Sequence, residues 1–193
     1  MDLAFDASGR FVGVEQEEVV ALGHYMMLAD ARLNLFTVFD DLKYDRSDID
    51  MMSPPMRTHA VSQLKALGFR QISGTVLHNK RDDVKCFIPK FHALGASPFD
   101  IARYTPKRSR DYYILTPTQT ACQYIDAYAH ENAIEKIVAL VKSQPINLFK
   151  LVDYLEKKPA HRDFRAAIGY IKSVQREAVT SDPLRRRRAL GSF

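Results

Sequence analysis

The sequence is poor in the residues that build disulfide frameworks, cofactor loops and membrane spans. Two cysteines among 193 residues, Cys86 and Cys122, cannot form a disulfide framework, and no CxxC pair is present. The common glycine-rich nucleotide loops, the GxSxG nucleophile elbow and the HExxH zinc motif are all absent. The most apolar long stretch, residues 19–39, is interrupted by polar residues, so no segment is expected to span a membrane. The acidic start, with Asp2 and Asp6, is unlike a secretory leader, and we therefore expect a cytoplasmic protein.

Charge is distributed unevenly along the chain. Residues 1–50 contain four Lys or Arg against eleven Asp or Glu, a net charge of −7, whereas the remainder contains twenty-four against twelve, or +12. The chain as a whole has a formal net charge of +5. This polarity favours a polyanion as the partner of the C-terminal part, and a different partner for the acidic N-terminal segment.

Apolar spacing predicts a long N-terminal helix. From Glu15 to about Lys43, apolar residues recur at helical intervals, and the acidic cluster at the start suits a helix N-terminus. The wide apolar stripe on this helix, together with a second stripe on residues 134–141, predicts a homodimer interface.

Local signals define the middle of the chain more sharply. A serine–proline pair starts a helix expected over residues 54–67, and Gly68 is a suitable left-handed stop. The β-strands expected after this helix are residues 71–78, 84–92 and 112–115, the first two flanking a turn at 79–83.

The C-terminal third is expected to be helical. Thr116 and Gln119 form a capping box with Pro117 at the first helical position. Three further helices are marked by apolar repeats at 134–141, 148–155 and 164–174.

The order of these elements resembles that of a known family. The run SPPMRTHAVSQLKALGFR, from Ser53 to Arg70, is followed by a hairpin with a basic turn, and then by YYILTP and a helix. This order resembles winged-helix DNA-binding domains, in which a recognition helix precedes a β-wing and a strand closes into the next helix. The resemblance covers roughly residues 47–128.

The expected fold is therefore mainly α with a small β-hairpin or sheet. We expect a winged-helix-like domain that is flanked by long N-terminal and C-terminal helices. Together with the N-terminal interface helix, this domain would occupy residues 1–129. A C-terminal helical lobe is expected over residues 130–180, followed by a basic flexible tail over 181–193.

The resemblance implies a set of DNA-binding residues. The polar face of helix 54–67 would read base edges, through Arg57, Thr58, Ser62 and Lys65. Basic turns and loops would hold phosphates. The residues expected there are Lys80, Arg81 and Lys85 at the hairpin turn, Arg103, Lys107, Arg108 and Arg110 in the next loop, and Arg185, Arg186, Arg187 and Arg188 in the tail. The competing interpretation of each set is an ordinary solvated surface.

The sequence contains few groups of residues that could be catalytic. Asp83 and Lys85, two positions apart in an expected strand, resemble the acid-x-lysine half of Mg²⁺-dependent restriction-type nucleases. A zinc site would need a fourth close ligand besides His78, Cys86 and His92, and none is evident. No catalytic residue, metal or cofactor is therefore assigned.

The sequence thus predicts a DNA-binding protein, a homodimeric transcription regulator that reads double-stranded DNA. The first alternative is a protein-interaction or inhibitor protein without nucleic-acid binding, which would dock its partner on the acidic N-terminal helix. The second alternative is a Mg²⁺-dependent nuclease. Salt-sensitive phosphate contacts separate the prediction from the first alternative, and Mg²⁺-dependent cleavage separates it from the second.

Overall fold

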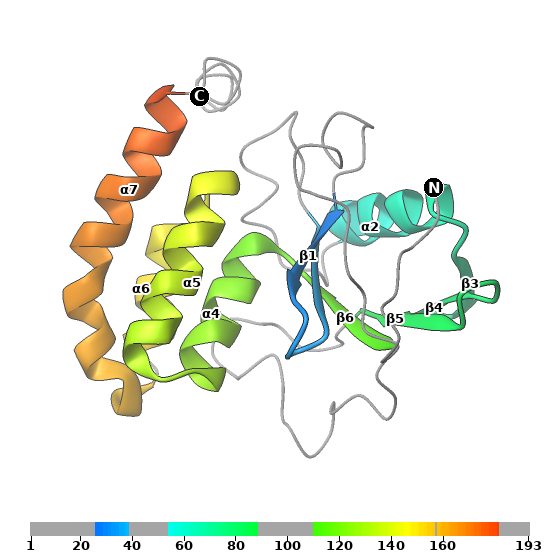
Figure 1. The fold of residues 1–193 in the computed structure, drawn as a ribbon, viewed down its shortest axis with the longest axis horizontal. Coiled ribbons are helices and arrows are strands. Elements are labelled where there is room, and N and C mark those ends of the chain that lie inside the picture. Colours follow the sequence, from blue (N-terminus) through cyan, green and yellow to red (C-terminus); the bar gives the residue numbers. More distant parts are fainter. Residues whose placement is uncertain (1–25, 39–53, 89–109, 157, 182–193) are drawn as a thin grey trace. The chain divides into compact units, whose positions relative to one another are not determined.

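The computed structural model describes residues 26–38, 54–88, 110–156 and 158–181 (Figure 1). The chain divides into two compact units. The described residues of the first unit are 26–38, 54–88 and 110–115, and those of the second are 116–156 and 158–181. A β-sheet and a helix make up the first unit, and the second is helical.

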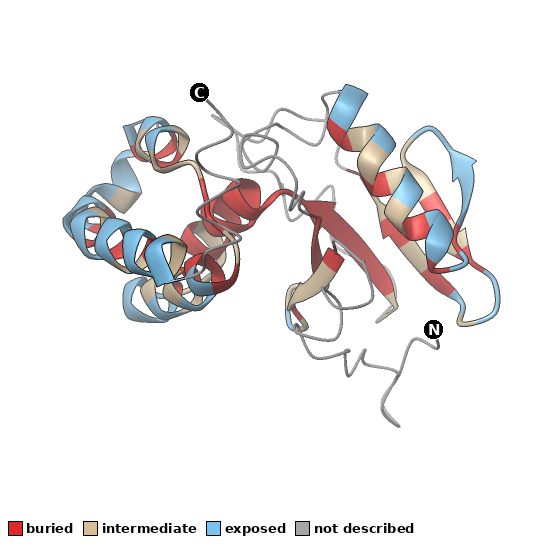
Figure 2. Ribbon diagram, turned by 90° about the horizontal axis from the view of Figure 1, so that it is seen from above, coloured by how far each residue is buried: buried red, intermediate tan, exposed pale blue. Residues whose placement is uncertain are grey.

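A six-stranded mixed sheet is the framework of the first unit, with the strand order β1-β2-β6-β5-β4-β3. The strands are β1 Met26–Asp30, β2 Leu35–Val38, β3 Arg70–Ser73, β4 Val76–Asn79, β5 Val84–Phe87 and β6 Asp111–Leu115. β6 lies parallel to both β2 and β5, and the other neighbouring pairs are antiparallel. β6 is buried along its whole length, as expected for a central strand with neighbours on both sides (Figure 2).

The long N-terminal helix expected from residue 15 to residue 43 is wrong for the part that the structure describes, which forms the β1–β2 hairpin. In the connecting turn, Asp30 Oδ1 accepts a hydrogen bond from the Leu33 N–H at 2.9 Å, and Asn34 has a φ of +51°. Short apolar runs fit a helical and a strand pattern equally well. The pairing of β2 with β6, which lies much later in the sequence, selects the strand conformation for residues 35–38. Residues 26–38 therefore do not form part of a helical apolar stripe. That stripe was one of the two from which the homodimer was predicted.

The expected fold class, mainly α with a small β-hairpin or sheet, is also wrong. The hairpin β4–β5 is present, but it lies inside a sheet that continues through β6 to β2 and β1. Residues 71–78, expected as one strand, are two strands with a turn at Gly74. The sheet is larger than expected because β6 has partners on both edges, which its own sequence does not specify.

Helix α2 (Pro54–Ala66) confirms the helix expected at this place. Its buried face consists of Met56, Ala60 and Leu64. Gly68, with a φ of +83°, ends the helix and donates its N–H to the Lys65 carbonyl at 3.0 Å. The Phe69 N–H donates to the Leu64 carbonyl at 3.0 Å, which completes a Schellman motif and turns the chain into β3.

The two faces of the sheet differ in burial. On β4 and β5, Leu77, Val84 and Cys86 are fully buried, whereas His78 and Lys85 between them are half-buried. α2 lies beside β3 (Figure 1). It lies on the buried face of the sheet, because the Asn79 side chain, which projects from the face opposite His78, donates a hydrogen bond to the Leu67 carbonyl at the end of this helix. The half-buried residues therefore lie on the face opposite α2.

The second unit consists of α4 (Pro117–Ala127), α5 (His130–Ser143), α6 (Leu148–Glu156), the 3₁₀ helix η2 (Pro159–Ala167) and α7 (Ile168–Ser181). The capping box at the start of α4 is confirmed. Thr116 Oγ1 accepts from the Gln119 N–H at 3.2 Å, and Gln119 Oε1 accepts from the Thr116 N–H at 3.1 Å. α5 packs against both α4 and α7. Among the helices of the described ranges, none is both long and apolar enough to cross a membrane.

Candidate nucleic-acid interface

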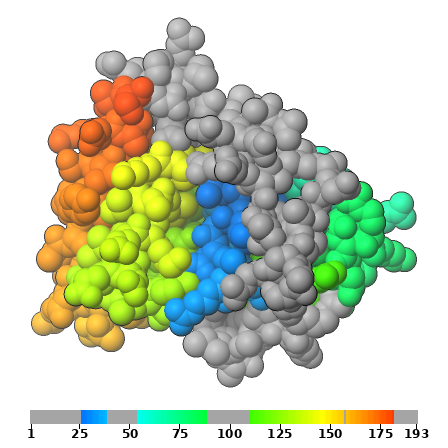
Figure 3. All heavy atoms as spheres, viewed as in Figure 1, coloured from blue at the N-terminus to red at the C-terminus, as the bar shows by residue number. Residues whose placement is uncertain are grey.

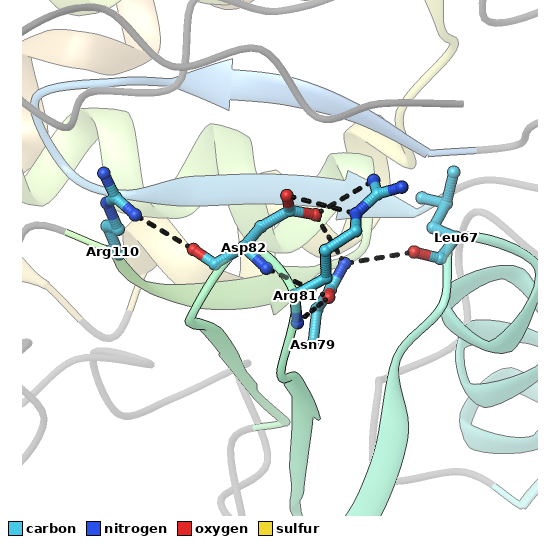
Figure 4. Close-up of polar contacts among 5 residues, drawn as sticks. All are labelled: Leu67, Asn79, Arg81, Asp82 and Arg110. Carbon is cyan, nitrogen blue, oxygen red and sulfur yellow. Dashed lines mark hydrogen bonds and ion pairs between the residues drawn. The ribbon is translucent and has the colours of Figure 1, made fainter.

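The β4–β5 turn is held in one conformation by the side chains of Asn79 and Asp82 (Figure 4). Asn79 Oδ1 accepts hydrogen bonds from the N–H groups of Arg81 and Asp82, at 3.0 and 3.3 Å. Asn79 Nδ2 donates to the Leu67 carbonyl at 3.3 Å and to the Asp82 carboxylate at 2.8 Å. Arg110 Nη1 donates to the Asp82 carbonyl at 3.0 Å. The turn is thereby fixed to the C-terminal end of α2 and to the start of β6.

A hollow of about 490 Å³ is formed by the end of α2, β3, β4 and this turn. Its lining residues are Ala66, Leu67, Gly68, Arg70, His78, Asn79, Lys80 and Arg81. Four of these eight residues are basic, and Asn79 is engaged in fixing the turn. In the space-filling view the β3–β4 segment, in green, lies at a margin of the first unit (Figure 3).

Arg81 forms an ion pair with Asp82 at 3.2 Å, which offsets its charge at the hollow. Arg70 and Lys80 are exposed in the lining of the hollow, and Lys65 is exposed in the adjacent last turn of α2. With respect to the described residues, the side chains of these three cations form no hydrogen bond or ion pair. We call Lys65, Arg70 and Lys80 the basic surface.

The helix residues predicted to read DNA fall into two groups. Thr58, Ser62 and Lys65 are exposed, and their spacing of four and three residues places them on one side of α2. Arg57 is half-buried, and its guanidinium donates a hydrogen bond to the carbonyl of Gly74 in the β3–β4 turn. Arg57 therefore braces that turn in the structure.

The residues predicted to hold phosphates are also dispersed. Lys80 and Arg81 lie in the β4–β5 turn, Lys85 lies on β5, and Arg110 precedes β6 and bonds to the turn. Arg103, Lys107, Arg108 and the four arginines of the tail, Arg185–Arg188, lie outside the described residues.

Two basic residues that were not among those predicted to contact DNA, Arg70 and His78, extend the set of basic side chains. Arg70 is paired with His78 across β3 and β4, and His78 with Lys85 across β4 and β5. Directly paired residues project from the same face of a sheet, so the three form a row across three strands, opposite α2. Side chains alternate between the two faces of a strand, so a buried Phe69 indicates that Arg70 projects outward. This position of Arg70 could have been predicted from the sequence. The row itself depends on strand register.

Asp83, the acidic residue of the predicted nuclease half-motif, does not lie on a strand. It has a φ of +51° in the β4–β5 turn, and its Oδ1 lies 3.2 Å from His78 Nε2. Strand alternation therefore does not place it beside Lys85. Within the ranges that the structure describes, no three His, Cys, Asp or Glu side chains gather as a possible metal site.

A second polar cluster lies in the helical unit. Asp126 on α4 contacts His161 Nε2 at 3.0 Å and Lys158 Nζ at 3.5 Å. Tyr154 on α6 is fully buried nearby, and its pKa is raised by burial and by the Asp126 carboxylate. The cluster ties the connection between α6 and η2 to α4.

Both thiols are expected to be unreactive in the folded protein. Cys86 and Cys122 are free and fully buried, and burial raises the pKa of each, with Asp111 and Asp126 respectively adding to the effect. A thiol reagent at about pH 8 should label neither cysteine in buffer and both in denaturant. The free energy of unfolding should fall above about pH 9, because the unfolded chain then releases thiol protons that the folded chain retains. Rapid labelling of the native protein would contradict the burial of these residues.

Comparison with known proteins adds no relative. No family model, no curated protein sequence and no solved structure matches this chain. The winged-helix resemblance thus stays a prediction.

Proposed function

We propose that this protein binds nucleic acid, in the form of double-stranded DNA, through the basic surface of Lys65, Arg70 and Lys80. The observation that supports the proposal is that Arg70 from a strand and Lys80 from a turn line one hollow, and that Lys65 is exposed in the last turn of α2, directly before the lining residue Ala66. Like charges repel one another, and the described residues supply these three with no acidic partner. A polyanion would relieve that repulsion and release its own counterions on binding.

The rigidity of the surface supports this role. Lys80 projects from a turn that Asn79 and Asp82 hold in place, and Arg70 follows directly on the Schellman motif that ends α2. A fixed arrangement of cations loses little conformational freedom on binding. Thr58 and Ser62, on the exposed side of α2, add hydroxyl groups that can bond to phosphates or base edges.

The two alternatives give different expectations. A protein partner with an acidic face would also be attracted to the basic surface, but binding would not follow the counterion-release law of a nucleic acid. A nuclease would need Mg²⁺ ligands close to Lys85, and the position of Asp83 in the turn gives that alternative no support.

The test is a salt titration with labelled random-sequence duplex DNA, read by fluorescence anisotropy. If three phosphates are contacted, the logarithm of the association constant should fall linearly with the logarithm of salt concentration, with a slope of about −2.7. Addition of Mg²⁺ without cleavage of the duplex would separate binding from nuclease activity. Absence of binding at low salt, or binding that salt leaves unchanged, would refute the proposal.

A further inference from the structure

We infer that the sheet face opposite α2 holds a single strand of nucleic acid, with one unstacked nucleotide in the hollow. This inference rests on the proposed function, because it needs nucleic acid to bind at the basic surface, and it adds an unpaired strand on the adjacent sheet face to the duplex proposed there. It is carried by three features that adjoin one another on the first unit: the row of basic residues, the hollow and an aromatic side chain.

The row Arg70–His78–Lys85 runs across the strands. Neighbouring strands lie about 4.8 Å apart, so the row extends over roughly 10 Å. Its next member across β5 and β6 is Asp111, a buried acid, which ends the row of basic side chains. A backbone of phosphates can therefore follow the row from Lys85 towards the edge strand β3, where Arg70 is exposed.

The hollow continues the row, because Arg70 and His78 line both. A volume of about 490 Å³ is much larger than a phosphate group needs, and it accommodates a sugar and a base as well. Its wall offers the apolar side chains of Ala66 and Leu67 for the base, and Arg70 and Lys80 for the phosphate. Bases in a duplex are stacked and paired and must be unpaired before they can enter a hollow, whereas a single strand offers them without unpairing.

An aromatic side chain lies beside the basic row. Phe87 is two positions after Lys85 on β5, so both project from the same face, and both are half-buried. The Phe87 ring packs on Tyr113, with the ring centroids 5.7 Å apart and the rings tilted by 41°. Aromatic rings next to a track of cations are the combination on which single strands bind, because bases stack on rings while phosphates follow the charge.

The test compares one fluorescein-labelled strand of about 12 nucleotides with the duplex that it forms with its complement. The variants are Lys85→Ala and Phe87→Leu, with Phe87→Tyr to restore an aromatic ring. Lys65→Ala is the matched control, because it removes one cation from the helix side and leaves the row unchanged. Circular dichroism melting checks that each variant is folded, since Phe87 also packs against the core around Leu35.

We expect Lys85→Ala and Phe87→Leu each to weaken binding of the single strand by about fivefold or more, and of the duplex by less than about twofold. Phe87→Tyr should bind as the wild type does, and Lys65→Ala should weaken both probes equally. Equal losses on both probes for Lys85→Ala, or none on either, would overturn the inference and leave the proposed function standing. Competition by poly-glutamate as strong as by the single strand would assign the face to an acidic peptide instead. Failure of the wild type to bind either probe would refute the proposed function itself.

Discussion

Replacing Lys65, Arg70 and Lys80 together with alanine is expected to weaken duplex-DNA binding by roughly one hundredfold at about 0.1 M salt. Each phosphate that a cation neutralises contributes about 0.9 to the slope of log affinity against log salt, so the slope should become shallower by about 2.7. The three side chains are exposed and form no hydrogen bond with described residues, and the variant should therefore unfold within about 0.5 kcal/mol per substitution of the wild type.

A second triple variant provides the control for this measurement. Arg162, Arg165 and Lys172 are exposed cations of the second unit, and their replacement by alanine changes the net charge by the same amount. Because general attraction depends on net charge and a site depends on position, we expect this variant to lose no more than about threefold in affinity. Equal losses in the two variants would mean that the basic surface is not a binding site.

Elements whose ends are set by local chemistry could be predicted from the sequence. Gly68 marks the end of α2 because a left-handed residue is needed there, and Thr116 with Gln119 marks the start of α4 because the capping box closes within four residues. The apolar repeats at 134–141 and 148–155 also gave the correct type of element, and the repeat at 164–174 spans the end of the 3₁₀ helix η2 and the start of α7. In each case the information lies within one or two helical turns.

The strands near the N-terminus could not be predicted in this way. Residues 35–38 are buried in a parallel pair with β6, and the Thr37 hydroxyl donates to the Leu115 carbonyl at 3.2 Å across the sheet. A strand buried on both faces is a continuous apolar run, which has no alternation to distinguish it from a helix. The partner that selects the extended conformation lies elsewhere in the sequence.

The candidate interface was only partly predictable for a related reason. Lys80 followed from its place in a polar turn, whereas Arg70 and His78 come together with Lys85 through strand register. Arg57 was predicted to contact DNA from its place on the polar face of helix 54–67, and Arg110 from the basic loop that contains it. In the structure their guanidinium groups donate to backbone carbonyls, and a sequence does not show which carbonyls lie within reach.

Replacing Gln175 with leucine is expected to lower the free energy of unfolding of the second unit by about 2–4 kcal/mol. The buried amide on α7 accepts a hydrogen bond from the Ile146 N–H at 2.9 Å and donates one to the Ile146 carbonyl at 3.0 Å. Leucine fills a similar volume but leaves both backbone groups of a fully buried residue without partners. The melting temperature, followed by circular dichroism, should fall by roughly 10 °C or more.

Two further variants show whether the loss comes from these hydrogen bonds. Lys172→Leu places the same side chain on an exposed position of α7 and should change the stability by less than about 0.5 kcal/mol. Gln175→Glu should be destabilised near neutral pH, where burial disfavours a charged carboxylate, and should regain stability as the pH falls toward about 4, since a protonated carboxyl both donates and accepts. The sign follows from the raised pKa of a buried acid, which binds its proton more tightly in the folded state. If Gln175→Leu melts within about 2 °C of the wild type, the contact with Ile146 does not hold the segment before α6 onto α7.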